Sequence, residues 1–240
     1  MSGHSKWSTI KRQKGTADVK RGATFTKLSN AITLAVKQGG GIGDPNQNFK
    51  LRLAVDAAKT SNMPKETIER AIARANGKDA SSFEEMIYEG FAPGGVAVIV
   101  EAATDNTNRT SSEIKNIFNK AGANFGQPGS VSYLFQTVGE VIVKKNGRTF
   151  DEIFGIGVDS GAEDVEDLGE EVALYVSAGD LNSFKERLTS EGFDITSADF
   201  VRKPTTKLAL PEEQTKKVLN FLETVEALDD VQKVYSNVSY

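Results

Sequence analysis

The first 77 residues place apolar side chains at intervals of about 3.6 positions, the period of an amphipathic α-helix. The pattern recurs in three segments, at about 16–38, 47–60 and 64–75. The inward positions are Phe25, Leu28, Ile32, Ala35 and Val36, then Leu51, Ala54, Val55 and Ala58, then Ile68, Ala71, Ile72 and Ala75. Glycine-rich and Asn/Pro-containing turns separate the segments. The pattern predicts a small three-helix domain over residues 1–77.

Beyond residue 83 the apolar period changes to 2, which is typical of β-strands. Strands are predicted around 86–88, at 96–103 and at 131–136, with a helix between the last two that buries Ile114, Ile117 and Phe118. Near the C-terminus a further segment at 207–210 precedes a predicted helix at 211–227 and a predicted strand at 231–238. We expect 83–136 and 204–240 to form one discontinuous domain.

Residues 138–203 contain a complete βαββαβ series, the ferredoxin-like pattern. Its predicted strands lie at 140–144, 163–167, 171–177 and 195–202, and its helices at 150–157 and 181–190. The sequence therefore predicts an α+β fold. The N-terminal three-helix domain is followed by two ferredoxin-like α/β domains, with the third inserted into the second.

Charge is distributed unevenly along the chain. Residues 1–80 contain 15 Lys and Arg against 6 Asp and Glu, whereas the other 160 contain 14 against 27, for a formal net charge of −4 overall. Such a basic end on an acidic protein indicates a polyanionic partner for the first part only.

The densest positive charge lies in residues 1–15, named here the arm, and continues into the first predicted helix. The candidate nucleic-acid-binding residues are His4, Lys6, Trp7, Lys11, Arg12, Lys14, Lys20 and Lys27. Cations contact phosphates, and a tryptophan stacks on an unpaired base. The alternative is a solvated basic tail with Trp7 packed against the helices.

Two further clusters are candidates for chemistry. The polar run Asp105, Asn106, Asn108, Arg109 and Thr110 precedes a predicted helix, and capping explains Asn108 and Thr110 but does not require Arg109. The acidic run 163–171 is suited either to Mg²⁺ or, as we expect, to a solvated edge that opposes sheet association. With one histidine and no cysteine, we expect no metal site, catalytic centre or cofactor.

Several blocks of sequence resemble the YebC family, whose mitochondrial relative is the translational activator of cytochrome c oxidase subunit one. The matching blocks are Gly3-His4-Ser5-Lys6-Trp7, Lys20-Arg21-Gly22, Phe25-Thr26-Lys27, Asn62-Met63-Pro64-Lys65, Ile68-Glu69-Arg70-Ala71-Ile72, Tyr88-Glu89-Gly90, Pro93-Gly94-Gly95-Val96-Ala97, Asp105-Asn106, Asn108-Arg109-Thr110 and Gly129-Ser130-Val131. The candidate nucleic-acid-binding residues also include Arg21, which belongs to the same basic opening, and Lys65, which lies in one of the matching blocks. It implies a non-enzymatic regulator of gene expression with three domains, the third interrupting the second.

Two functions follow from the resemblance. The preferred hypothesis is a ribosome-associated translation factor that relieves stalling at proline-rich sequences, with ribosomal or transfer RNA as its partner. The alternative is a DNA-binding transcriptional regulator acting at a promoter. A third hypothesis, a Mg²⁺-dependent nuclease, lacks a carboxylate set with defined spacing. No apolar run has the length of a membrane span and the basic opening lacks the apolar core of a secretion signal, so we expect a cytoplasmic protein without a membrane partner.

Overall fold

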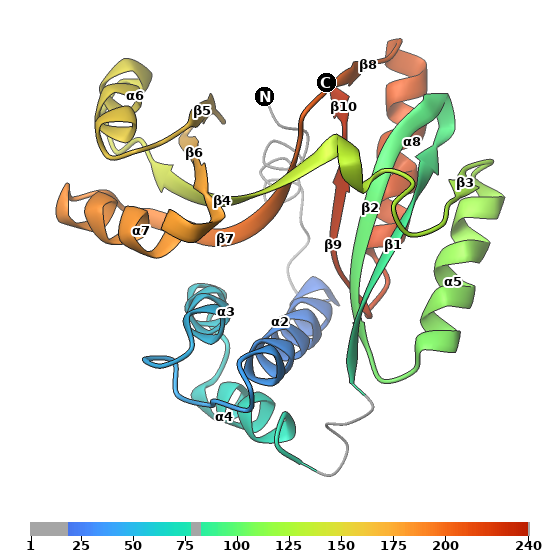
Figure 1. Ribbon diagram of the computed structural model, residues 1–240, viewed down its shortest axis with the longest axis horizontal. Coiled ribbons are helices and arrows are strands. Elements are labelled where there is room, and N and C mark those ends of the chain that lie inside the picture. The colour runs from blue at the N-terminus through green and yellow to red at the C-terminus, as the bar shows by residue number, and fades with distance from the viewer. Residues whose placement is uncertain (1–18, 78–82, 240) are drawn as a thin grey trace. The chain divides into compact units, whose positions relative to one another are not determined.

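The computed structural model describes residues 19–77 and 83–239, in which helices pack against antiparallel sheets and one short parallel strand pair is present (Figure 1). The α+β class predicted from the sequence is thereby confirmed. The chain divides into two compact units. The described residues of the continuous unit are 135–205, and those of the split unit are 19–77, 83–134 and 206–239.

The split unit begins with helices α2 (Val19–Gln38), α3 (Phe49–Thr60) and α4 (Lys65–Arg74). They confirm the three predicted helical segments, although residues 16–18 of the first lie outside the described residues. Their buried cluster comprises Ile32, Ala35, Val36, Leu51, Val55, Ala58, Met63, Ile68, Ala71 and Ala75, with Phe25, Leu28, Ala54 and Ile72 partly buried beside it. The helical period therefore identified this core correctly.

Asn48 links the first two helices through its side chain. Its Oδ1 accepts from the Leu51 amide at 3.1 Å, which caps the start of α3. Its Nδ2 donates to the carbonyl oxygens of Ala35 at 2.9 Å and Ile42 at 3.2 Å. Because Asn48 is buried, water could not take the place of its side chain as the hydrogen-bond partner of these backbone groups.

Replacing Asn48 with alanine is expected to destabilise the protein by about 2 kcal/mol, since the helix cap and two carbonyl partners are lost together. Urea denaturation followed by circular dichroism measures the change. Asn46→Ala is the matched control, because Asn46 is exposed in the same loop. An equal loss of stability in both variants would contradict the role assigned to Asn48.

The rest of the split unit is built on a four-stranded sheet with the order β3-β1-β2-β9. Its elements are β1 (Glu84–Ala92), η2 (Pro93–Gly95), β2 (Val96–Thr104), α5 (Thr107–Lys120), β3 (Asn124–Phe125), η3 (Ser132–Leu134), β8 (Leu208–Ala209), α8 (Glu212–Glu226), β9 (Val231–Ser236) and β10 (Val238–Ser239). The sheet thus combines three strands that precede the continuous unit in the sequence with one strand, β9, that follows it.

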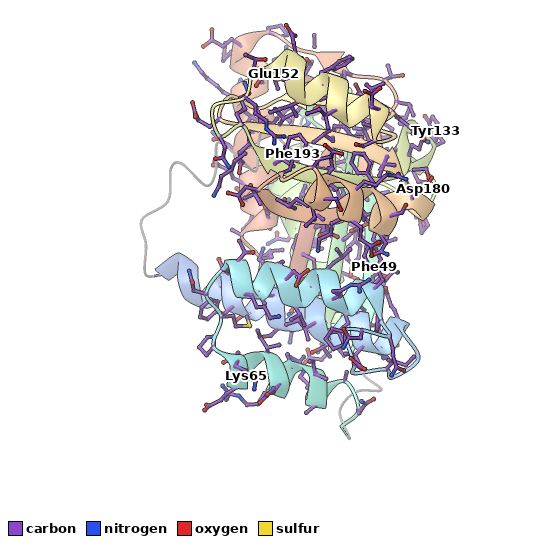
Figure 2. The ribbon with its side chains drawn as sticks, turned by 90° about the vertical axis from the view of Figure 1, so that its left-hand side faces the viewer. Phe49, Lys65, Tyr133, Glu152, Asp180 and Phe193 are labelled. Carbon is purple, nitrogen blue, oxygen red and sulfur yellow. The ribbon has the colours of Figure 1, made fainter. Side chains whose placement is uncertain are left out.

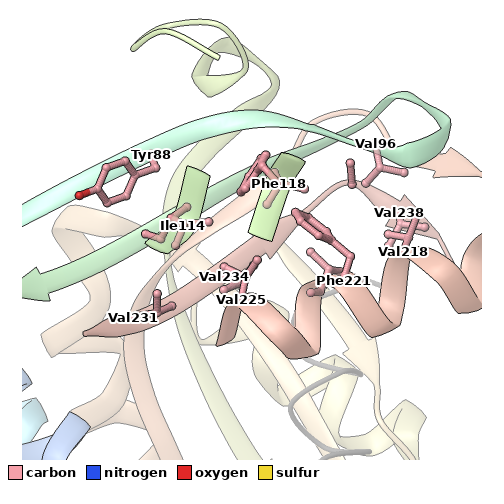
Figure 3. Packing of buried hydrophobic residues seen from close by; sticks show 14 of the residues in the cluster. Tyr88, Val96, Ile114, Phe118, Val218, Phe221, Val225, Val231, Val234 and Val238 are labelled. Carbon is pink, nitrogen blue, oxygen red and sulfur yellow. The ribbon is translucent and has the colours of Figure 1, made fainter. Parts of the chain in front are cut away.

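Helices α5 and α8 cover one face of this sheet and bury its main core (Figure 3). The Phe118 ring meets Phe125 and Phe221 edge to face, with centroids 5.5 and 4.9 Å apart. Ile114, as predicted from the sequence, is fully buried, and so is Val218. Edge-to-face contacts of this kind are favourable and add to the stabilisation that apolar burial gives this core.

The predicted strand at 131–136 is wrong. Residues 132–134 form the 3-10 turn η3, and the next strand begins at Phe135 and pairs in the other sheet. The short β3, which pairs with β1 at Gly90 and Phe91, fills the edge of the sheet instead. Gly90 permits this approach, because a Cβ there would lie 2.3 Å from the Asn124 carbonyl oxygen.

The continuous unit contains the βαββαβ series on one antiparallel sheet with the order β5-β6-β4-β7. Its elements are β4 (Phe135–Lys144), α6 (Phe150–Asp159), β5 (Asp164–Asp167), β6 (Glu171–Ser177), η4 (Ala178–Asp180), α7 (Leu181–Ser190) and β7 (Ile195–Pro204). A capping box between Thr149 and Glu152 begins α6. Each element falls within a few residues of its predicted position.

Candidate nucleic-acid interface

The candidate residues of the arm are His4, Lys6, Trp7, Lys11, Arg12 and Lys14, and they lie outside the described residues. Lys20 and Arg21 lie in the first turn of α2, although their side chains are also outside the description. That turn contains no Asp or Glu. Lys20 and Arg21 therefore add positive charge to the positive end of the helix dipole. Together they favour the binding of an anion at the N-terminus of α2.

Lys27 occupies a different setting from the one its sequence position suggested. Its side chain is half-buried and its Nζ donates to the backbone carbonyl of Glu226, the last residue of α8. A cation at the C-terminal end of a helix is favoured by the helix dipole. Contact between Lys27 and phosphate would therefore compete with a bond inside the protein.

Lys65, the first residue of α4, is open to solvent (Figure 2). Its side chain is 88% exposed, and its Nζ lies 3.6 Å from the Glu69 carboxylate one turn later. An exposed pair of this kind contributes little to stability. The ammonium is consequently accessible to an anionic ligand.

The polar cluster before α5 is held together by a residue that the sequence analysis missed, Asp230. Its Oδ2 accepts from Thr110 Oγ1 at 2.6 Å, from Arg109 Nη2 at 2.9 Å and from Thr104 Oγ1 at 3.2 Å. Arg109 also donates to Asp105 Oδ1 at 3.2 Å. Arg109, which capping did not explain, thus ties the start of α5 to the turn before β9.

A helix cap at the start of α5 belongs to the same polar cluster. The Asn106 side chain accepts from the Arg109 amide at 3.0 Å and so caps α5, rather than Asn108, which is exposed. The Asn108 backbone carbonyl accepts from Ser112. The cluster is internally satisfied, so its geometry supports a structural role.

Burial alone would raise the pKa of Asp230, but hydrogen bonds from Thr110 and Arg109 and the guanidinium charge outweigh it and hold the pKa below its ordinary value. A lowered pKa means that the ionised form stabilises the fold. This contribution is present above the ordinary pKa of 3.8 and is lost as the pH falls further through the lowered value.

Replacing Asp230 with alanine is expected to lower the free energy of unfolding by about 2–3 kcal/mol. The hydroxyls of Thr104 and Thr110 and the guanidinium of Arg109 would lose the carboxylate that accepts hydrogen bonds from all three. Thermal and urea unfolding at pH 7 measure the effect. Asp229→Ala is the control, since Asp229 is the adjacent exposed carboxylate. If both variants unfold alike, the cluster does not tie α5 to β9 as described.

Glu89 was also missed as an important residue, although it lies in one of the blocks singled out from the sequence. Its carboxylate accepts from the amides of Gly129 and Val131 at 2.8 Å and Ser132 at 2.9 Å. It is 6% exposed. Two sequence blocks some forty residues apart are thereby joined, and the loop leading to β4 is held in place.

The acidic run 163–171 spans β5, which is an edge strand, and the turn to β6. Asp167 pairs with Lys145 Nζ at 2.8 Å. Within residues 19–77 and 83–239, no group of three or more His, Cys, Asp or Glu is arranged to hold a metal ion. Over the same residues, no helix combines the length and apolar character needed to cross a bilayer.

Two family models match this chain. The TACO1/YebC protein N-terminal domain matches residues 5–78, and the TACO1/YebC second and third domain matches residues 83–238. Relatives named as probable transcriptional regulatory proteins match along the whole chain. The protein from Chloroflexus aurantiacus is 45% identical, covering 99% of this chain and 95% of its own, and that from Thermomicrobium roseum is 43% identical, covering 100% and 97%.

A solved structure shares the fold. The crystal structure of a conserved hypothetical protein from Aquifex aeolicus superposes with a TM-score of 0.87 at 42% identity, covering 93% of this chain and 92% of that one. Motifs, family models, full-length relatives and fold agree, and the chain belongs to the TACO1/YebC family.

Proposed function

We propose that this protein is a nucleic-acid-binding regulator of gene expression that works on the ribosome, where it relieves stalling at proline-rich sequences. Its arm and the first turn of α2 would contact ribosomal or transfer RNA. The observation that carries the proposal is the concentration of cations there: residues 1–37 hold eight Lys and Arg against the single carboxylate Asp18. The acid-free first turn of α2 adds to the same positive end.

The composition of helices α3 and α4 favours RNA over base-specific reading of duplex DNA. A helix that reads the major groove presents Arg, Asn or Gln side chains to base edges. Neither α3 nor α4 exposes an Asn or Gln, and α4 mixes Arg70 with the exposed acids Glu66 and Glu69. Irregular RNA requires no such helix, since cations and a stacking aromatic are sufficient.

Cosedimentation tests the proposal. The protein should travel with ribosomes at moderate salt, and its ribosomal fraction should rise in cells whose ribosomes are stalled at proline codons. Protein that stays in the soluble fraction of such cells would count decisively against a ribosomal function.

A second candidate function, transcriptional regulation at a promoter, is favoured by the names of the relatives. In that case the same cations would contact duplex phosphates. The hypothesis requires that some promoter be bound more than about 10³-fold more tightly than random duplex. Selection from a random duplex library, followed by affinity measurement, decides whether such a sequence exists.

A further inference from the structure

Helix α6 of the continuous unit exposes apolar side chains along one flank. Phe154 is 46% exposed and Val158 is 47% exposed, whereas Ile153 and Gly157 of the same helix are buried. Phe150 is half-buried one turn earlier, and its ring centre lies 6.1 Å from that of Phe154. Side chains four positions apart lie one above the other on a helix. Phe150, Phe154 and Val158 therefore form one continuous row, named here the α6 stripe.

The α6 stripe differs from the scattered apolar side chains of an ordinary surface. Over residues 19–77 and 83–239, the large apolar side chains that are at least 40% exposed are Ile42, Ile87, Tyr133, Phe154 and Val158. The last two lie one helical turn apart, while the first three belong to different elements or loops. Single exposed apolar residues are common, but adjoining ones mark interaction sites. The stripe is thus suited to cover by another surface.

Gly155 leaves open space beside the stripe. A Cβ at this position would meet no heavy atom within 4 Å, apart from its own neighbours in the helix. Glycine inside an exposed helix is less stable than alanine, and the packing of the unit does not require it here. A position without a Cβ lets the backbone of another segment approach closely. Close approach by a partner accounts for glycine at this position.

The charges on α6 are all negative. The helix contains Asp151, Glu152 and Asp159 and no Lys or Arg, and Glu152 marks its first turn in Figure 2. Asp151 is exposed and lies three positions before Phe154, so it borders the stripe. The unit as a whole has 15 Asp and Glu against 7 Lys and Arg over residues 135–205. A ligand that complements the stripe is therefore apolar and positively charged at once.

The same charges decide against other occupants. If two copies of α6 packed on each other, each helix would meet three acids and no base, and like charges in contact oppose association. An anionic membrane surface and nucleic acid would be repelled for the same reason. A basic protein remains as the occupant that charge favours.

The shape of the stripe fits a helix. A row of side chains four positions apart forms a ridge, which packs into the groove between the ridges of a second helix. From Phe150 to Val158 the stripe is about 12 Å long, so a partner helix of about 11–14 residues covers it. We propose that the α6 stripe is a docking surface for a basic amphipathic helix of another protein, whose apolar side is bordered by Lys and Arg. This binding is separate from nucleic-acid contact by the arm.

A synthetic peptide serves as the probe. It is a labelled helix of about 16 residues, with leucine at helical spacing on one side and Lys or Arg along both flanks. Fluorescence anisotropy measures its affinity for the full-length protein. The wild-type protein should bind it at least about tenfold more tightly than the matched peptide in which Glu replaces every Lys and Arg.

Phe154→Gln with Val158→Gln should weaken peptide binding at least about tenfold. Both side chains are about half exposed, so the variant should fold, and circular dichroism checks this. The matched control is Ile42→Gln with Ile87→Gln, which changes exposed aliphatic side chains of the split unit. That control should bind the peptide as wild type does.

Gly155→Gln separates docking from a merely structural role. Its side chain enters open space and glutamine is a better helix former, so the midpoint of thermal unfolding should be unchanged or raised. Peptide affinity should nevertheless fall about tenfold, because the new side chain occupies the place of the partner. A variant that is at least as stable as wild type and binds the peptide equally well would contradict close approach at Gly155 and overturn the proposal.

Charge is tested by Asp151→Asn with Asp159→Asn. Peptide affinity should fall about three- to tenfold at about 50 mM salt, and its dependence on salt should become weaker. The control is Glu186→Gln with Glu191→Gln, which removes the same charge from exposed positions at and after α7. Equal losses in the two charge variants would show that net charge, rather than the stripe, attracts the peptide.

Several other results would overturn the proposal. Peptide affinity that is unchanged in Phe154→Gln with Val158→Gln, or lowered equally in its control, would exclude the stripe as the binding surface. Wild-type self-association that this variant abolishes in sedimentation would assign the stripe to a second copy. Binding of acidic phospholipid vesicles that the same variant abolishes would assign it to a membrane.

The arm and the proposed function are tested separately. If replacing Lys11, Arg12 and Lys14 with glutamine raised the affinity for the peptide, the stripe would be assigned to the arm of the same chain and the proposal overturned. The stripe variants should bind a single-stranded RNA of about 20 nucleotides as wild type does. Peptide binding as predicted, without any RNA binding by the wild-type protein, would contradict the proposed function alone.

Discussion

Replacing Glu89 with alanine is expected to lower the free energy of unfolding by about 3–4 kcal/mol, because three backbone amides lose a buried charged acceptor together. The amides of Gly129, Val131 and Ser132 would be left without the carboxylate that orders their loop. Urea denaturation at pH 7 measures the loss. Glu84→Ala, at the exposed start of the same strand, is the control and should change stability by less than about 0.5 kcal/mol.

The same carboxylate predicts a dependence on pH. Burial alone would raise the pKa of Glu89, but the hydrogen bonds from the Gly129, Val131 and Ser132 amides outweigh it and hold the pKa below its ordinary 4.5. Its stabilisation is therefore complete above the ordinary pKa and is lost as the pH falls through the lowered value. Stability should decline more steeply between about pH 5 and 3 in wild type than in Glu89→Gln. Identical slopes would show that Glu89 does not titrate with folding.

The second large effect concerns binding. Replacing Lys11, Arg12 and Lys14 together with glutamine should make the slope of log affinity against log salt shallower by about 2, as expected for three lost contacts to single-stranded phosphates. Since such a contribution disappears near 1 M salt, the loss at 0.1 M salt is about 100-fold. Fluorescence anisotropy with labelled RNA over a salt series measures both quantities.

The control replaces three other lysines with glutamine, so that the net charge changes by the same amount as in the arm variant. Lys115, Lys216 and Lys217 are exposed lysines on α5 and α8, and the last two form surface pairs with Glu212 and Glu213. Their replacement with glutamine should leave the salt slope unaltered. An arm variant that binds with undiminished strength and unchanged salt sensitivity would refute phosphate contact by these three residues.

Local pattern was sufficient to predict most of the fold. The helical period placed Ile32, Leu51 and Ile68 in one core, and alternation placed the strands of the continuous unit, because burial of one face imposes these periods. The error at 131–136 has a nonlocal cause. The Val131 and Ser132 amides bind the Glu89 carboxylate instead of a neighbouring strand, and no local pattern reveals a partner forty residues away.

The location of the candidate site stays a prediction that rests on charge, because the arm lies outside the described residues. Charge alone identified the arm, since cations accumulate there regardless of tertiary structure. The partners of Arg109 and Lys27 were not predictable, because Asp230 and Glu226 lie far along the chain. Both cations are used within the split unit, which shows that a basic residue in a promising block is not thereby a ligand-binding residue.

Ultraviolet crosslinking in living cells tests the central claim most directly, when the attached nucleic acid is sequenced and the modified peptides are identified by mass spectrometry. Adducts are expected to concentrate in the arm and the start of α2, including the peptide that contains Trp7, with ribosomal or transfer RNA as the attached polymer. Adducts confined to residues 135–205, with every peptide of the arm unmodified, would contradict it.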